Sequence, residues 1–367
     1  MQSSGSMTLS RQELLGIMIR LAIFGVVSYY GIKWVVDQMD PTKKQKAQAQ
    51  KQAERLMNKI GIKGVKLTEY EMTIAALLID PLGITVSWQD IGGLEDVIDE
   101  IKETVILPMK KRHLFRGSSL LQPPKGILLH GPPGCGKTMI AKAMAKEAGF
   151  RFINLQASTL TDKWYGESQK LAAAVFSLAI KIQPTIIFID EVDSFLRSRA
   201  SYDHEATAMM KAQFMSLWDG LITDNSCQVI VMGATNRPQD VDSAILRRMP
   251  TMFHIGMPDK GQRKKILELI LCEEYLSEDM DLSTVAEETE GYSGSDLHEL
   301  CRNGSVFRVK DYMKEQRESG EQEGDSAEDG LDMLRPLALS DLQNAKLKMD
   351  EAKRKRDGRM ESNIGLD

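Results

Sequence analysis

The chain has 367 residues, of which 42% are hydrophobic and 27% are charged. This composition is that of a globular protein with a sizeable core, and it excludes a mainly disordered or collagen-like chain. The net charge of −5 is unevenly spread, because residues 1–60 hold nine basic and four acidic residues and the remainder carries −10. A folded part this acidic lacks the basic surface of a nucleic-acid-binding protein, so we expect no nucleic acid among its partners.

Residues 14–36, after a short N-terminal segment at 1–13, are predicted to form a single transmembrane helix. These 23 residues are apolar except for Arg20 and Lys33 near the two ends, and as a helix they would span about 34 Å. A cleaved signal peptide or a surface-lying amphipathic helix is the alternative, but neither a small-residue cleavage site nor a wide polar face is present. Six basic residues between positions 43 and 59 follow the apolar run. The positive-inside rule then places the long C-terminal part in the cytosol.

The chain after the apolar run divides into four predicted parts. Residues 37–84 form a basic linker that ends in an amphipathic helix near 65–81, and residues 85–258 form the large domain. A helical domain follows at 259–355, interrupted by a loop at 311–332 with nine acidic and two basic residues, which we expect to be disordered. Residues 356–367 form a tail. The four cysteines of the chain are far apart and show no zinc spacing, which indicates a reducing compartment.

The large domain alternates short apolar runs with helical patterns. Continuous apolar strands separated by helices are typical of a parallel sheet that is covered on both faces. The sequence therefore predicts an α/β fold with five parallel strands, at residues 126–131, 151–156, 185–190, 228–236 and 253–258.

A glycine-rich segment after the first of these strands matches G-x-x-x-x-G-K-[ST], the phosphate-binding loop of nucleotide-binding proteins. Its backbone N–H groups would surround the phosphates, Lys137 would reach the β and γ oxygens, and the Thr138 hydroxyl would ligate Mg²⁺. ATP and Mg²⁺ are the expected cofactors. The residues expected at the nucleotide are Gly131, Pro132, Pro133, Gly134, Cys135, Gly136, Lys137, Thr138 and Met139.

Polar side chains end the next strands. Asp190, at the end of a buried strand, is placed to hold Mg²⁺ or its water, and Glu191 beside it can polarise the attacking water. An acid pair at a strand end can also be a helix N-cap. Asn236 ends a further strand and can hydrogen-bond the γ-phosphate or the water, although a turn asparagine is the simpler alternative.

The segments GPPGCGKT, IIFIDEVDSF, GATNRP, DSAILRR and GYSGSDL, in this order within residues 85–355, resemble the AAA+ ATPases of the classical AAA clade. The resemblance implies a P-loop NTPase with a small helical lid. It also implies that Arg247 and Arg248 of one subunit complete the site of its neighbour. A guanidinium supplied in this way contributes about 10³ to 10⁵ in rate. A surface-exposed basic pair is the alternative for these two arginines.

The same resemblance assigns residues outside the glycine-rich loop to the nucleotide. Asp90, Ile91 and Gly92 correspond to the adenine pocket, and Gly294 and Ser295 approach the nucleotide from the lid. Cys135 stands where many relatives have threonine. We hypothesise that a helix N-terminus lowers the pKa of its thiol and makes it reactive, with an inert spacer as the alternative.

Two aromatic residues lie in the loop after the second strand. The segment Lys163, Trp164, Tyr165, Gly166 is similar to the substrate-gripping loop of AAA unfoldases, where flat rings contact an extended polypeptide in the central pore. Packing of these rings onto their own domain is the alternative. A second pore loop is expected around residues 201–204, and it includes His204.

An anchor followed by one AAA+ module resembles the thorase-type family of membrane-anchored AAA+ ATPases of the mitochondrial outer membrane. The resemblance implies a homo-hexamer that extracts mislocalised tail-anchored proteins by threading them through its pore, at mitochondria and at peroxisomes. The alternatives are an ATPase that disassembles protein complexes or receptor scaffolds, and a non-enzymatic tether. The intact Glu191 and the paired arginines argue against the tether.

Overall fold

The structure is a computed structural model that describes residues 24–25, 67–115, 123–156, 167–195, 205–224, 227–319 and 334–364. The chain divides into two compact units, residues 1–63 and 64–367. No helix in the described part of the chain is long and apolar enough to cross a membrane. The transmembrane helix predicted at 14–36 lies outside the described residues, apart from Phe24 and Gly25, which are helical.

The second unit begins with a short helix and a short strand. Helix α3 (Glu69–Ala75) starts at a capping box in which the Thr68 and Glu71 side chains bond each other's backbone N–H. Strand β1 (Leu78–Ile79) follows and pairs antiparallel with β3. The helix predicted near 65–81 is therefore too long, because pairing with a sheet edge overrides the helical pattern at its C-terminal end.

A six-stranded mixed sheet forms the centre of the large domain, in the order β1-β3-β4-β5-β2-β6. The five parallel strands predicted from the sequence are confirmed, but the antiparallel edge strand β1 was not predicted. The last strand also starts two residues earlier than expected, because Thr251 pairs with Ile127. The parallel strands are β2 (Gly126–His130), β3 (Arg151–Leu155), β4 (Thr185–Ile189), β5 (Val229–Thr235) and β6 (Thr251–His254).

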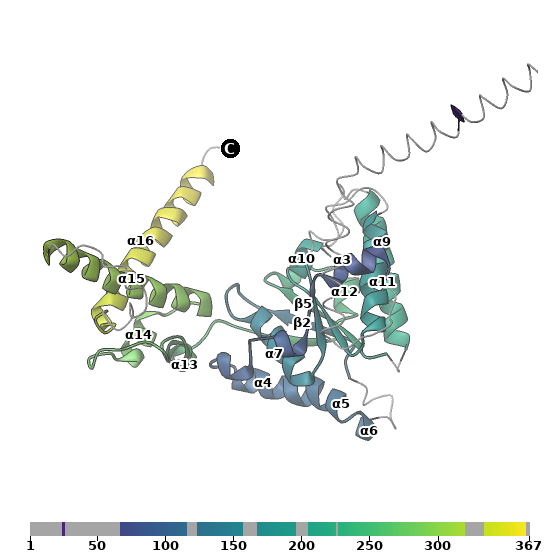
Figure 1. The fold of residues 1–367 in the computed structure, drawn as a ribbon, viewed down its shortest axis with the longest axis horizontal. Coiled ribbons are helices and arrows are strands. Elements are labelled where there is room, and N and C mark those ends of the chain that lie inside the picture. Colours follow the sequence, from purple (N-terminus) through teal and green to yellow (C-terminus); the bar gives the residue numbers. More distant parts are fainter. Residues whose placement is uncertain are drawn as a thin grey trace, which may run out of the picture. The chain divides into compact units, whose positions relative to one another are not determined.

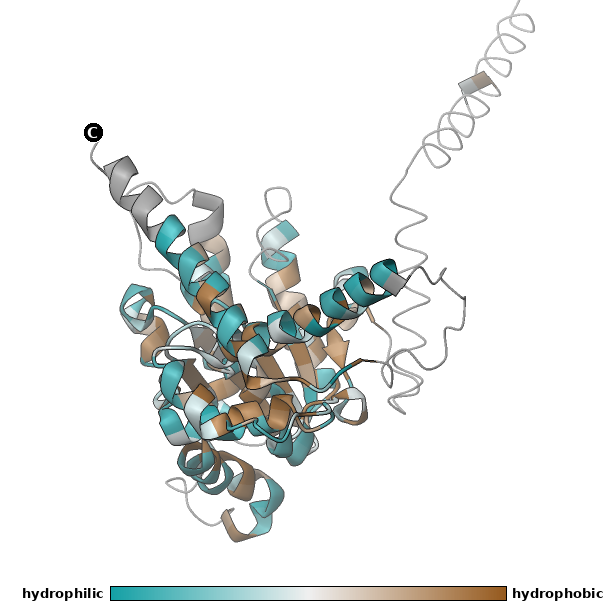
Figure 2. Ribbon diagram, turned by 90° about the vertical axis from the view of Figure 1, so that its left-hand side faces the viewer, coloured by the Kyte–Doolittle hydropathy of each residue, from teal (hydrophilic) through white to brown (hydrophobic). Residues whose placement is uncertain are grey.

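Helices cover both faces of this sheet (Figure 1). On one face α7 (Lys137–Ala148) packs with α4 (Glu95–Ile101), a π-helical turn (Lys102–Ile106) and α5 (Leu107–Lys110). On the other face lie α9 (Glu167–Lys181) and α11 (Glu205–Thr223), whose Phe176 and Phe214 rings meet edge to face at 4.7 Å. Figure 2 shows hydrophobic strands enclosed by helices with hydrophilic outer faces, as expected for a buried parallel sheet.

Several short elements connect these layers. They are the 3₁₀ turns at Pro81–Gly83, Trp88–Asp90 and Pro238–Asp240 and the helices α6 (Arg112–Phe115), α10 (Val192–Phe195) and α12 (Ser243–Leu246).

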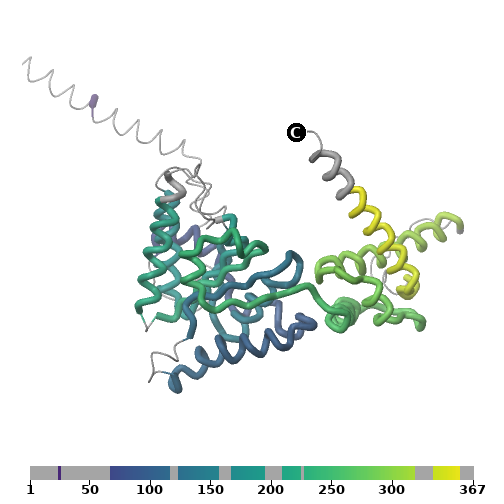
Figure 3. Tube along the Cα trace, turned by 180° about the vertical axis from the view of Figure 1, so that it is seen from behind, coloured from purple at the N-terminus to yellow at the C-terminus, as the bar shows by residue number. Residues whose placement is uncertain are grey.

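Four helices form the lid: α13 (Lys260–Ile270), α14 (Leu282–Glu288), α15 (Gly294–Ser319) and α16 (Leu339–Ile364). They enclose a separate hydrophobic core, and α16 crosses α15 and packs against it (Figures 1 and 3). The prediction of a disordered loop at 311–332 is wrong for residues 311–319, because these residues continue α15. Arg335 pairs there with Asp311 at 2.6 Å, so a basic residue from a distant segment offsets part of the acidic charge. Residues 320–333 lie outside the described part of the chain.

Candidate active site

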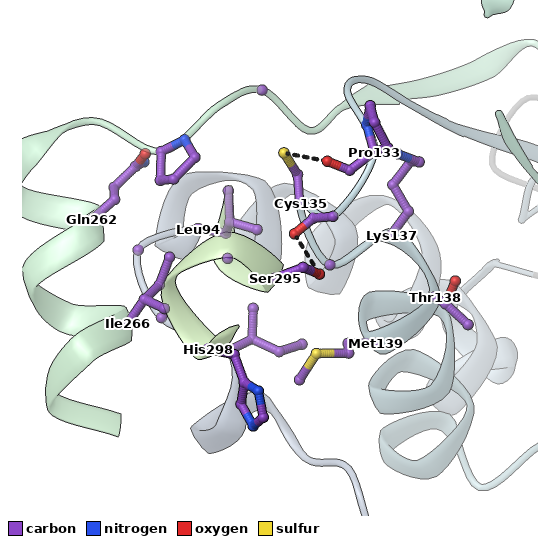
Figure 4. A pocket seen from close by; sticks show the side chains of 18 of the residues that line it. Leu94, Pro133, Cys135, Lys137, Thr138, Met139, Gln262, Ile266, Ser295 and His298 are labelled. Atoms are coloured by element: carbon purple, nitrogen blue, oxygen red, sulfur yellow. Dashed lines mark hydrogen bonds between the residues drawn. The ribbon is translucent and has the colours of Figure 1, made fainter. Parts of the chain in front are cut away.

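A pocket of about 500 Å³ lies at the carboxyl edge of the parallel strands. It is lined by residues 90–94, the glycine-rich loop with the start of α7, the ends of β4 and β5, the segment after β6, and helices α13 and α15 of the lid. Figure 4 shows side chains from the loop and from both lid helices around the same space. The crevice outside the carboxyl ends of parallel strands is the usual ligand site of α/β proteins.

The glycine-rich loop turns sharply between β2 and α7. Gly131 has φ 147°, and a Cβ there would lie 1.9 Å from the Ile255 carbonyl oxygen. Gly136, with φ 93°, is the N-cap of α7. The loop therefore brings backbone N–H groups and a helix N-terminus to the pocket, and that arrangement binds phosphate.

Lys137 is the first residue of α7 and is only 8% exposed. Its Nζ donates to the carbonyl oxygens of Gly131, at 2.9 Å, and Pro132, at 2.6 Å. Burial lowers the pKa of Lys137, while Cys135 and Asp190 act in the opposite direction. Because the two carbonyl groups are neutral, they do not compensate the positive charge of the Lys137 ammonium. An anionic phosphate therefore fits beside it.

The residues predicted for Mg²⁺ lie together. The Thr138 hydroxyl donates to Asp190 Oδ2 at 3.0 Å, and the other carboxylate oxygen of Asp190 accepts from the Glu191 N–H at 3.0 Å. A hydroxyl and a carboxylate are the oxygen ligands that Mg²⁺ prefers alongside phosphate and water. The donor set therefore fits the predicted metal.

Glu191 has φ 49°, the only positive φ of a non-glycine residue among the described residues. Its carbonyl oxygen accepts from both the N–H and the hydroxyl of Ser194, each at 2.8 Å, and these bonds hold the strained turn. The residue is exposed and lines the pocket, as a residue that activates water must.

Asn236 follows β5 and also lines the pocket. The preceding Thr235 hydroxyl donates to Asp193 at 2.7 Å and accepts from the Arg237 N–H at 2.9 Å, which fixes the turn. Glu191 and Asn236 thus come from the ends of two paired strands, β4 and β5.

The two arginines differ in their surroundings. Arg248 forms a bidentate pair with Asp219 of α11, with both N···O distances 2.7 Å, and its third bond goes to the Ala244 carbonyl at 2.8 Å. This hydrogen-bonded pairing lowers the pKa of Asp219. Arg247 is exposed, and neither arginine lines the pocket of its own chain. That position is compatible with action on a neighbouring subunit.

The residues predicted for adenine also line the pocket. Figure 4 shows Leu94, two residues further along the chain, on the opposite side of the pocket from Lys137 and Thr138. The Asp90 carboxylate accepts from the N–H and hydroxyl of Ser87, at 2.7 and 2.8 Å, and these bonds lower its pKa. The Asp90 carboxylate thus caps the start of the 3₁₀ turn at Trp88–Asp90. Gly92 lies tightly against α13, since a Cβ there would come 3.1 Å from the Ile266 nitrogen.

Several lining residues were not predicted from the sequence. They are Gly93, Leu94, Gly256, Pro258, Gln262, Ile266, Ile270 and His298. The spacing of four between residues 262, 266 and 270 marks one face of α13, which could have identified a contact surface but not the ligand. His298 gives no local signal, because only the folding of the lid brings α15 to the pocket (Figure 4).

The predicted lid residues do contact the glycine-rich loop. The Ser295 N–H donates to the Gly134 carbonyl oxygen at 3.1 Å, and a Cβ on Gly294 would lie 3.3 Å from the same oxygen. The first turn of α15 therefore rests directly on the phosphate-binding segment.

Cys135 lies beside Met257, with 3.6 Å between the two sulfur atoms. Burial raises the pKa of its thiol, although Lys137 acts in the opposite direction. The hypothesis of a thiol with a lowered pKa is therefore wrong. The predicted pore-loop residues Lys163, Trp164, Tyr165, Gly166 and His204 lie outside the described part of the chain.

Family comparisons agree with this geometry. Residues 127–257 match the family described as "ATPase family associated with various cellular activities (AAA)", and residues 279–323 match the AAA+ lid domain. The "Outer mitochondrial transmembrane helix translocase" of Danio rerio is 65% identical over 94% of this chain and 92% of the relative. The protein with the same name in Homo sapiens is 65% identical over 95% and 94%. The chain belongs to this translocase family of AAA ATPases.

A solved structure extends the comparison to the fold. The FIGL-1 AAA domain in complex with ADP matches with a TM-score of 0.64 and 32% identity, over 77% of this chain and 90% of that one. Members of the AAA family bind and hydrolyse ATP, so this translocase-family chain is an ATPase. The pocket with Lys137, Asp190 and Glu191 is the site where its residues meet the requirements of that reaction.

Proposed function

We propose that the chain is an ATP-driven translocase that extracts transmembrane segments of proteins from the mitochondrial outer membrane. The observation that carries the proposal is 65% identity, over 94% of the chain, to relatives named for this translocase activity. The Lys137, Asp190 and Glu191 side chains that line the pocket support it, because extraction consumes ATP.

The proposed hydrolysis assigns a role to each group at the pocket. The backbone N–H groups of residues 131–138 and the Lys137 ammonium bind the phosphates and neutralise their charge. Glu191 accepts a proton from the attacking water, and Asn236 orients that water against the γ-phosphate. Thr138 and Asp190 would hold Mg²⁺, which supplies charge stabilisation to the β and γ oxygens.

We assign the assembly to a homo-hexamer in which Arg247 and Arg248 reach the γ-phosphate of the adjacent subunit. The Asp219 pair orients Arg248, while the exposed Arg247 can extend further. A cation supplied from a neighbour makes hydrolysis depend on assembly. Binding and hydrolysis of ATP are thereby coupled to the contacts between subunits.

The substrate path consists of residues 163–166 and the loop containing His204. In the proposed cycle Trp164 and Tyr165 wedge between side chains of an extended polypeptide and move with the ring. The clients are mislocalised tail-anchored proteins. The anchor at 14–36 places the ATPase on the cytosolic side of the outer mitochondrial membrane and also of peroxisomes.

The test is extraction from liposomes that carry a labelled tail-anchored protein. The full chain with ATP should release the label, and Glu191→Gln should bind ATP and client without release, because the water is no longer activated. Trp164→Ala should retain ATP hydrolysis but release no label. Release by the Glu191→Gln chain would contradict the site, and undiminished release by Trp164→Ala would contradict the pore loop.

Client trapping distinguishes extraction from disassembly of complexes. Glu191→Gln in native membranes should hold single tail-anchored proteins, identified by mass spectrometry after crosslinking. Recovery of intact soluble complexes or receptor scaffolds instead would favour the disassembly ATPase.

A further inference from the structure

The first turn of α15 touches the nucleotide-binding loop, and its position is set by a small polar cluster. Ser293 caps the helix: its N–H and hydroxyl both donate to Asp296 Oδ2, at 3.0 and 2.8 Å. Gly294 and Ser295 then meet the Gly134 carbonyl of the loop. A shift of this turn would therefore change the shape of the pocket directly.

Helix α16 holds this turn from the other side. The Tyr292 hydroxyl donates to Asp350 Oδ1 at 2.6 Å, and Lys346 pairs with the other oxygen of Asp350 at 2.8 Å. The Lys353 ammonium lies 4.2 Å from the centre of the Tyr292 ring and 3.3 Å from Asp296 Oδ1. Lys353 thus contacts both Tyr292, which precedes the capping Ser293, and Asp296, whose carboxylate accepts the Ser293 hydrogen bonds.

The cluster is more than a surface ion pair. Tyr292 is 5% exposed, and its hydroxyl is satisfied by Asp350, so loss of that carboxylate leaves a polar group without its partner in a poorly hydrated site. Burial, followed by the hydrogen bond to Asp350, raises the pKa of Tyr292, which keeps its hydroxyl a donor at neutral pH. The Lys353 cation over the buried Tyr292 ring adds attraction that an exposed ion pair lacks.

We propose that Asp350 and Lys353 are positioning residues for nucleotide binding, through which α16 controls the contact between the α15 N-terminus and the glycine-rich loop. Neither touches the pocket. They act through Tyr292 and Asp296, about 55 residues earlier in the chain, and the charge on α16 therefore sets how firmly the lid closes on bound nucleotide.

The expected effect is on affinity and not on the chemical step. Lys353→Met should raise the KM for ATP and the Kd for a fluorescent ADP analogue about five- to tenfold, as a loss of roughly one hydrogen bond and one cation–π contact implies. The kcat at saturating ATP should change less than twofold, because Lys137, Asp190 and Glu191 are untouched. Lys353→Arg should restore the affinity.

A matched control lies on the same helix. Lys348 also sits over an aromatic ring, 4.3 Å from the centre of Phe307, but its partner is away from the α15 N-terminus. Lys348→Met removes the same charge and the same kind of contact, and it should leave the KM and Kd unchanged. Both variants are measured in the full-length chain, with the melting temperature recorded.

Two results would overturn the proposal. One is an equal rise in KM for Lys353→Met and Lys348→Met, which would show a general loss of lid stability. The other is a fall in kcat with KM unchanged. Tyr292→Phe, which keeps the ring but removes the hydroxyl, provides a milder second variant and should raise the Kd about threefold. Because nucleotide binding is measured directly, these results do not depend on which protein client is extracted.

Discussion

The two ends of the nucleotide pocket are built in different ways. The phosphate end comes from one continuous segment, residues 133–139, and from the ends of two adjacent strands. The base end combines residues 90–94 with α13 and α15, which are up to about 200 residues away in the chain. The phosphate end is thus a product of local backbone geometry, while the base end depends on packing of the lid. Changes at the first should affect catalysis, and changes at the second should affect affinity.

A large effect is expected at the phosphate end, from Lys137→Met. Removing the buried ammonium takes away the charge that binds the β and γ oxygens, so kcat/KM for ATP should fall by at least about 100-fold. Steady-state hydrolysis measures this. Activity within tenfold of the unchanged chain would mean that another cation serves the phosphates.

Arg247→Ala tests whether the phosphate end is completed by a neighbour. The kcat should fall by about 10³, while the Kd for ADP stays unchanged, because the guanidinium acts on the transition state and from another subunit.

Asp219→Asn tests the orientation of the second arginine, Arg248. It should lower kcat only about tenfold, since Arg248 keeps its bond to the Ala244 carbonyl. If Asp219→Asn has no effect, the Arg248 pair is structural only.

Gly93→Ala disturbs the base end. Gly93 has φ +78°, and a Cβ there would lie 2.5 Å from the Gln262 Cβ of α13. Strain of about 1–3 kcal/mol should appear as a KM for ATP raised roughly five- to 150-fold, with kcat nearly constant. Gly83→Ala is the control, because nothing lies within 4 Å of its added Cβ. A loss of kcat with KM unchanged would erase the distinction between the two ends.

Glu71 lies outside the pocket and should affect stability alone. It is 1% exposed and receives hydrogen bonds from Ser177 at 2.6 Å and Lys181 at 2.7 Å, which tie α3 to α9. Glu71→Gln should lower the free energy of unfolding by about 2–3 kcal/mol, less than for a fully buried pair because Lys181 is partly exposed. The KM for ATP should not change.

The pH dependence gives a second measurement on Glu71. Burial by itself would raise the pKa of this carboxyl, but hydrogen bonds from Lys181, Ser177 and the Thr68 N–H outweigh burial and lower it. Its stabilisation is therefore complete above the pKa of the unfolded chain, about 4.3, and is lost as the pH falls through the lower folded-state value. The difference in melting temperature between the unchanged chain and Glu71→Gln should be constant from pH 6 to 8 and shrink below about pH 4. A difference that is as large at pH 3 as at pH 7 would contradict this assignment.

The parts of the fold that were predicted are those with strong local signals. Apolar runs marked all five parallel strands, and the spacing of Gly131, Gly136 and Lys137 marked the phosphate loop. Each of these features follows from a few consecutive residues, since a strand–glycine–helix turn has little freedom. The strand β1 escaped prediction because two residues carry no periodicity of their own.

The sequence by itself determined the five parallel strands and the glycine-rich turn into α7, because each follows from a few consecutive residues. Only the tertiary structure decided which residues close the pocket from the lid, that Asp219 holds Arg248, and that burial raises the pKa of Cys135. These features depend on contacts between residues far apart in the chain. Burial and distant charges, which set such contacts and pKa values, exist only after the helices have packed against the sheet.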